Sequence, residues 1–163
     1  MIARACPVPG DALLHAYVDR AGTYTDCFEV MHPGAVDLND FIAAFYATWL
    51  FRLERFVLTL TQRRRITDAD VKALATGAAD RFAVWTVEAR TESQVLLCDA
   101  SGHTRSYLAV APKEGGVTRL IFGSAVVARP DGSLPTWVRV LMPLHRLYSK
   151  ALLRLAERRM RFT

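Results

Sequence analysis

The hydrophobic pattern of this chain is most regular near its C-terminus, from Leu134 to Met160. Five apolar side chains and one histidine recur there at steps of three and four: Val138, Leu141, His145, Tyr148, Leu152 and Leu155. That spacing is typical of one face of an α-helix. Pro135 suits the first turn of such a helix, where its missing N–H is not needed. The pattern therefore predicts a long C-terminal helix, about 38 Å from end to end.

A different period dominates the middle of the chain. From Arg81 onward the apolar positions tend to alternate, as in β-strands, in four segments: Phe82–Ala89, Gln94–Ala100, Thr104–Ala111 and Val117–Arg129. Short polar turns separate them at about ten-residue intervals, which predicts an antiparallel meander. A less regular alternation predicts one earlier strand, over Thr23–His32.

Helical segments lie between that first strand and the meander. Asp37 can cap an apolar helix that runs toward Leu60, with a break near Trp49. Thr67 and Asp70 have the spacing of a capping box, so a short helix is expected up to about Thr76. Residues 1–22 form an N-terminal extension, in which Asp11 can cap a short helix.

The order of these elements predicts the fold class. Residues 1–163 are expected to form a single α+β domain in which a curved antiparallel β-sheet grips the long C-terminal helix. The short helices fall between the first strand and the meander. A pocket enclosed between the sheet and the helix would be mostly apolar.

Composition adds little to this picture, but the distribution of charge does. The 163 residues are 52% hydrophobic and carry a formal net charge of +5. Four cations recur at steps of four on a separate face of the predicted final helix: Arg146, Lys150, Arg154 and Arg158. This basic face has two open interpretations, either a solvated helix surface or a docking surface for an anionic membrane or an acidic protein. Nucleic acid is not expected as a partner, because no recognition motif accompanies the charge.

The cysteines do not indicate a metal site or a cofactor. Cys6, Cys27 and Cys98 form no C-x-x-C pair, so neither a structural zinc site nor any other cofactor is expected. Three reduced thiols and an N-terminus without the apolar run of a signal peptide predict a cytoplasmic protein. The apolar stretch Phe41–Phe51 is too short to span a membrane.

Four stretches in this order carry a resemblance to a known superfamily. They are Tyr24–Val30, the predicted helix Asp37–Leu60, Gly123–Val126 and Met142–Tyr148. The chain resembles the SRPBCC helix-grip superfamily, which includes START lipid-transfer domains, birch-pollen-allergen proteins and polyketide cyclases. Within it, a group of small uncharacterised bacterial proteins is most similar. The resemblance implies a seven-stranded sheet and an internal apolar cavity, but no single chemistry.

Several polar residues are candidates for a functional role. His145 lies on the apolar face of the final helix, two residues after Pro143, so it is either a core histidine or a polar group aimed into a pocket. Asp26 and Glu29 have opposite parity in the first strand, so one carboxylate is expected to face the covered side of the sheet. Neither Cys27 nor Cys98 has a visible activating base, and nucleophilic catalysis is not expected.

Aromatic and apolar residues at helix or strand spacing are either core packing or the lining of the cavity. The set predicted to bind a ligand is Phe45, Trp49, Trp85, Tyr107, Phe122, Leu141, His145 and Tyr148, with Trp137 as a further aromatic candidate.

Three functions follow as hypotheses. The first is binding of an apolar small molecule or lipid between the sheet and the final helix. The second is a cyclase-type or dehydratase-type enzyme that uses a polar cavity residue such as His145. The third is an interaction module that docks its basic helix face. The ligand and the oligomeric state are not predicted.

Overall fold

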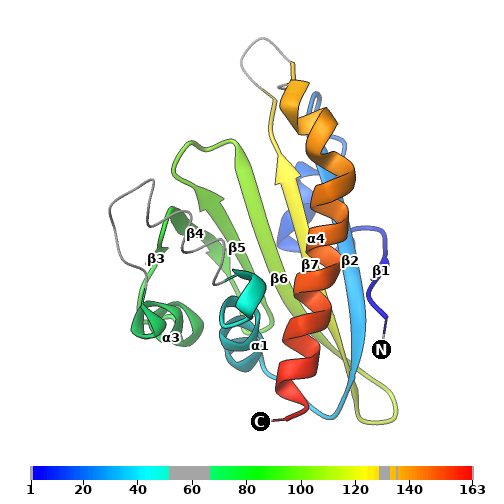
Figure 1. Ribbon diagram of the computed structural model, residues 1–163, viewed down its shortest axis with the longest axis vertical. Coiled ribbons are helices and arrows are strands. Elements are labelled where there is room, and N and C mark those ends of the chain that lie inside the picture. Colours follow the sequence, from blue (N-terminus) through cyan, green and yellow to red (C-terminus); the bar gives the residue numbers. More distant parts are fainter. Residues whose placement is uncertain (1, 52–66, 129–132, 135, 163) are drawn as a thin grey trace.

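The computed structural model describes residues 2–51, 67–128, 133–134 and 136–162. In chain order the elements are β1 (Arg4–Ala5), the 3₁₀-helix η1 (Leu13–Tyr17), β2 (Tyr24–Pro33), α1 (Leu38–Tyr46), α3 (Asp68–Thr76), β3 (Arg81–Phe82), β4 (Trp85–Arg90), β5 (Gln94–Asp99), β6 (Thr104–Lys113), β7 (Val117–Val126) and α4 (Thr136–Met160). The fold is α+β, with the long helix α4 lying along β2 and β7 (Figure 1).

The described strands form one curved antiparallel sheet of seven, in the order β1-β2-β7-β6-β5-β4-β3. The predicted meander is confirmed as β4 to β7. The first predicted meander segment contains two strands rather than one, since Ala83 adopts a positive φ of 54° between β3 and β4. The strands β1 and β3 are two residues long, which is too short for a visible alternation.

The first long strand, β2, pairs along its full length with β7. This register places Asp26 opposite Ser124 and Phe28 opposite Phe122, and residues opposite each other in a sheet point to the same face. Phe28, Phe122 and their neighbours form the larger core beneath α1, α3 and α4. The pairing therefore places Asp26, Phe28, Phe122 and Ser124 together on the helix-covered face.

The opposite face of the sheet is covered as well. The 3₁₀-helix η1 lies behind the sheet in Figure 1, and its Leu14 and Tyr17 pack with Ile121 and Ala125 of β7 in a second core. The predicted cap at Asp11 is wrong: Ala12 precedes the helix without a side-chain cap. Instead, the backbone N–H of Leu13 donates to Oε1 of Gln94 at 2.9 Å, so the sheet itself satisfies the helix terminus.

The helices between β2 and the meander begin at the capping residues that the sequence predicts. Asp37 caps α1 by accepting from the Asp40 backbone N–H at 2.8 Å. Helix α1 ends at Tyr46, and residues 49–51 are helical again, which confirms the break near Trp49. The rest of that predicted helix, toward Leu60, lies outside the described residues. The capping box of Thr67 and Asp70 opens α3 as predicted.

The final helix confirms the prediction of a long C-terminal helix. Its C-terminal half carries the residues that are fully or almost fully buried: Ser149, Leu152, Leu153, Ala156 and Glu157. Its N-terminal half, in contrast, exposes Leu141 and Leu144 beside a pocket. Pro135 and the side chains of residues 136–139 lie outside the described parts. Among the described side chains of α4, those of the second half thus pack as core.

Gly123 of β7 lies against Leu14 of η1. A Cβ atom at this position would lie 2.6 Å from Cδ2 of Leu14 and 3.0 Å from the carbonyl oxygen of Asp26. Both distances are shorter than ordinary van der Waals contacts, so an added Cβ requires the Leu14 side chain to move and presses on the backbone of β2.

We expect Gly123→Ala to lower the free energy of unfolding by about 1–2 kcal/mol, since Leu14 can shift but the Asp26 backbone cannot. Urea unfolding followed by circular dichroism measures this. Gly10→Ala is the control, because a Cβ at Gly10 meets nothing within 4 Å. Equal stability of the two variants would contradict the close approach.

Candidate functional site

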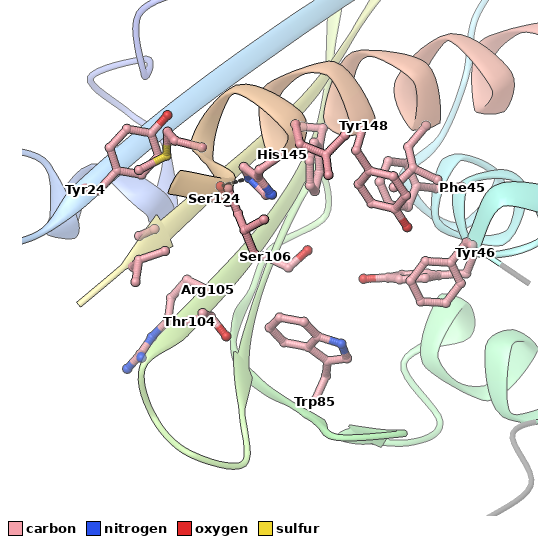
Figure 2. Close-up of a pocket in the computed structure, with 18 residues that line it drawn as sticks. Tyr24, Phe45, Tyr46, Trp85, Thr104, Arg105, Ser106, Ser124, His145 and Tyr148 are labelled. Atoms are coloured by element: carbon pink, nitrogen blue, oxygen red, sulfur yellow. Dashed lines mark hydrogen bonds between the residues drawn. The ribbon is translucent and has the colours of Figure 1, made fainter. Parts of the chain in front are cut away.

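A pocket of about 520 Å³ lies between the sheet, α1 and the N-terminal half of α4 (Figure 2). Its lining is mostly aromatic and aliphatic: Tyr24, Phe45, Tyr46, Phe51, Trp85, Thr104, Arg105, Ser106, Phe122, Ser124, Ala125, Val126, Leu141, Met142, Leu144, His145, Tyr148 and Leu152. Both its size and its apolar character lie in the usual range of small-molecule sites.

A cluster of polar side chains stands at the end of the pocket where β2, β7 and α4 meet. Asp26 of β2 and Ser124 of β7 are directly opposite in the sheet, and His145 reaches them from α4. Ser124 Oγ lies 2.5 Å from Asp26 Oδ1 and 2.9 Å from His145 Nε2. The distance from His145 Nε2 to Asp26 Oδ2 is 3.5 Å. Three parts of the chain that are distant in sequence thus share one network.

The hydrogen bonds fix where the protons of this network lie. The Ser124 hydroxyl donates its single hydrogen to the carboxylate of Asp26, so it accepts from His145. His145 therefore carries a hydrogen on Nε2. The other edge of its ring faces the pocket (Figure 2), where Nδ1 accepts a hydrogen bond if the ring is neutral and donates one if it is protonated.

The environment keeps Asp26 ionised. Burial by itself raises a carboxyl pKa, but the hydrogen bonds from His145, Ser124 and Tyr24 outweigh burial and lower the pKa of Asp26 below its ordinary value of 3.8. Burial, followed by the charge of Asp26, raises the pKa of Tyr24 to about 12, so Tyr24 stays protonated and donates to Asp26 Oδ2 at 3.0 Å. The cluster is a buried anion held by three donors.

This arrangement differs from the triad of a serine hydrolase. In a triad the serine donates to the histidine, which in turn donates from its second nitrogen to the carboxylate. Here Ser124 donates directly to Asp26, and both residues lie at the same nitrogen of His145. Ser124 is therefore held as a bridge, and the ring atom available to a ligand is His145 Nδ1.

Six of the eight residues predicted to bind a ligand line this pocket: Phe45, Trp85, Phe122, Leu141, His145 and Tyr148. The other two lie elsewhere. Tyr107 belongs to the second core on the opposite face of the sheet, where its hydroxyl donates to Gln94 at 2.9 Å. Trp49 follows the break after α1 and is 64% exposed. The side chain of Trp137 lies outside the described residues.

The sequence interpretation did not include Ser124 and Tyr24 in the site. Ser124 gives little signal, because a small polar residue in an apolar strand is usual. Asp26 is easier to recognise from the sequence, because a carboxylate at an inward position of β2 is costly to bury without partners. Of the two carboxylates of opposite parity, Asp26 is the one that faces the helix, whereas Glu29 pairs with Arg4 and Arg119 behind the sheet.

The predicted basic face is mostly exposed. Arg146, Arg154 and Arg158 are exposed on α4. Lys150 is half-buried, with its Nζ 5.8 Å from the ring centre of Phe28. Docking of this face on an anionic membrane or an acidic protein stays a prediction, which flotation with anionic and neutral vesicles would test.

The described residues contain neither a cluster of metal-ligating side chains nor a helix that could span a membrane. No group of three or more His, Cys, Asp or Glu side chains there is placed to hold a metal ion. None of the helices in the same residues combines the length and apolarity needed to cross a membrane.

Together the fold and the pocket define a class of protein: an antiparallel sheet with a long C-terminal helix and an apolar pocket between them. Comparison of the chain with family models, with curated proteins and with solved structures found no match. The function is therefore argued from the site alone.

Proposed function

We propose that this protein binds an apolar small molecule, or the acyl part of a lipid, in the pocket beneath α4. The observation that carries the proposal is a pocket of about 520 Å³ with a mostly apolar lining, into which His145 presents a hydrogen-bonding edge. Such a site favours a ligand with a carbon skeleton and few polar groups. The cytoplasmic location and the helix-grip superfamily that the sequence indicates are part of this proposal.

The mouth of the pocket offers a test with a matched control. Leu144 lines the pocket and is 62% exposed, whereas Leu147 is 66% exposed on the same helix and lies outside the lining. Glutamine preserves helix propensity at both positions. We expect Leu144→Gln to weaken binding of the fluorescent probe anilinonaphthalene sulfonate about fivefold, because part of the apolar contact of a leucine is lost.

Fluorescence titration of the probe measures this, with energy transfer from tryptophan as a second signal because Trp85 lines the pocket. Leu147→Gln should bind as the wild type does. Equal weakening in both variants would mean that the probe binds the outer surface of α4, and the proposal would fail. If Leu144→Gln alone weakens binding, native mass spectrometry of protein from its own host identifies the natural ligand.

A second candidate is an enzyme that uses His145 as a general acid–base. The observation in its favour is the Asp26–Ser124–His145 network at the edge of an apolar pocket. The network holds the imidazole ring through its Nε2 hydrogen and leaves Nδ1 facing the pocket. His145 Nδ1 can thus take a proton from a ligand carbon or oxygen and return it, as cyclases, dehydratases and isomerases require.

Proton exchange tests this candidate without knowledge of the substrate. The protein is incubated in heavy water with a panel of cyclic ketones, and magnetic resonance follows the loss of hydrogen beside each carbonyl. Catalysed exchange should be lost in His145→Asn and retained in His103→Asn, a change at an exposed turn histidine. Exchange no faster than in buffer for the whole panel would exclude this activity for ketones.

A further inference from the structure

The N-terminal segment brings together two cysteines that are 21 positions apart in sequence. The Sγ atoms of Cys6 and Cys27 lie 3.5 Å apart and share a hydrogen bond. From the spacing of the thiols along the chain we expected three separate reduced thiols, and all three are free in the structure. Two of them are nonetheless neighbours, and they lie on the face of the sheet opposite to the pocket.

The backbone geometry around this pair suits a covalent bond. Strand β1 pairs with β2 so that Ala5 is opposite Phe28, which places Cys6 opposite Cys27. The Cys6 N–H continues the ladder by donating to the Cys27 carbonyl oxygen at 3.0 Å. Directly opposite residues in an antiparallel pair have Cα atoms about 4.5–5.5 Å apart, inside the range that disulfides span. For the bond to form, the two sulfur atoms have to approach from 3.5 Å to bonding distance.

The two thiols are unequal in a way that suits stepwise exchange. Cys6 is half-buried, whereas Cys27 is 3% exposed. The hydrogen bond with Cys27 lowers the pKa of Cys6, against burial and the charge of Glu29, and Arg119 adds to the lowering. The same hydrogen bond, followed by burial, raises the pKa of Cys27. Cys6 is therefore the accessible nucleophile and Cys27 the resolving thiol.

We propose that Cys6 and Cys27 form a reversible disulfide that locks the N-terminal segment onto the sheet. The oxidant is a small disulfide such as oxidised glutathione. The Cys6 thiolate attacks one of its sulfur atoms, so that a mixed disulfide forms and one glutathione thiolate leaves. The Cys27 thiol then loses its proton to solvent and attacks the Cys6 sulfur, and the second glutathione leaves. The two protein thiols lose two electrons and two protons, and one glutathione disulfide becomes two thiols.

The bond would close a loop that contains η1, the element that covers the second core. Oxidation therefore holds η1 against the second face of the sheet, next to Cys27 and its neighbour Asp26 in β2. This proposal is independent of ligand binding, since it concerns the other face of the sheet.

The test is thiol accessibility in the full chain across a series of glutathione redox buffers. After acid quenching, the protein is unfolded, labelled with N-ethylmaleimide and weighed. Wild-type protein should change from three labels to one, and digestion should yield a peptide pair joined through Cys6 and Cys27. Oxidation should also raise the midpoint of thermal unfolding by several degrees.

Three single variants make the result specific. Cys6→Ser, at a half-buried site, should keep both remaining labels and lose the thermal shift. Cys98→Ser should still form the bond, because Cys98 lies in β5, which β6 and β7 separate from β2 in the sheet. Cys27→Ser should stop at a glutathione adduct on Cys6. A wild-type adduct that is never resolved, or three labels in the most oxidising buffer, would overturn the proposal.

Discussion

Replacing Phe45 with alanine is expected to lower the free energy of unfolding by about 3–5 kcal/mol. Phe45 is 2% exposed, and its ring centre lies 4.9 Å from that of Phe122 on the sheet. The rings of Phe41 and Tyr46 contact it edge-on at 6.0 and 5.4 Å. Removing this ring takes away the contact through which α1 holds the sheet beside the pocket.

Chemical unfolding measures the loss, and Phe162→Ala is the control. Phe162 is 84% exposed, so its removal should change stability by no more than about 0.5 kcal/mol. Because Phe45 also lines the pocket, the alanine variant should bind the fluorescent probe more weakly even under conditions in which it remains folded. A loss of less than about 1 kcal/mol would mean that Phe45 is not a central core residue.

The second large effect is expected at Asp26. Its carboxylate accepts hydrogen bonds from Tyr24 and Ser124 and lies 3.5 Å from His145 Nε2. Asparagine has the same shape but replaces one acceptor with a donor and removes the charge. We expect Asp26→Asn to cost about 2–3 kcal/mol at neutral pH, the usual worth of buried hydrogen bonds to a charged group.

The same substitution should reveal a pH dependence. Since folding lowers the pKa of Asp26, the stabilisation is fully present above its unfolded value of 3.8 and is lost as the pH falls through the lower, folded value. The stability difference between wild type and Asp26→Asn should therefore shrink as the pH falls below 3.8. Urea unfolding at a series of pH values measures it. A difference that grows on acidification below pH 4 would contradict an ionised, hydrogen-bonded Asp26.

Local sequence signals predicted much of this fold because each acts within a few residues. The Thr67–Asp70 capping box and the Asp37 cap set the starts of α3 and α1 without help from the rest of the chain. The alternation after Arg81 predicted the meander for the same reason. The ends of strands were harder to predict than their interiors. The sequence analysis treated β3 and β4 as one strand, because nothing in the sequence marks the positive φ of Ala83.

The site was only partly predictable, since it depends on which face of the sheet each residue occupies. Tyr107 and Phe122 are both aromatic residues in apolar strands, yet they point to opposite faces. The sequence did not reveal that the N-terminal extension covers the second face, so both aromatic residues were assigned to one cavity. The contact between Cys6 and Cys27 was hidden for a similar reason, because a strand of two residues leaves no periodic pattern.

The pairing of β2 with β7 has a consequence for how the chain folds. Asp26 and Ser124 are 98 positions apart, whereas β4 to β7 pair with their neighbours in sequence. Contacts between distant positions form slowly, because a long loop has to close first. During synthesis on the ribosome, β2 emerges well before its partner β7, so its edge stays unpaired until β7 is made. The strands β4 to β7 can pair with each other in succession, because each one follows its partner in the chain. The hydrogen bonds of Asp26 can then serve as a spectroscopic marker of the pairing of β2 with β7.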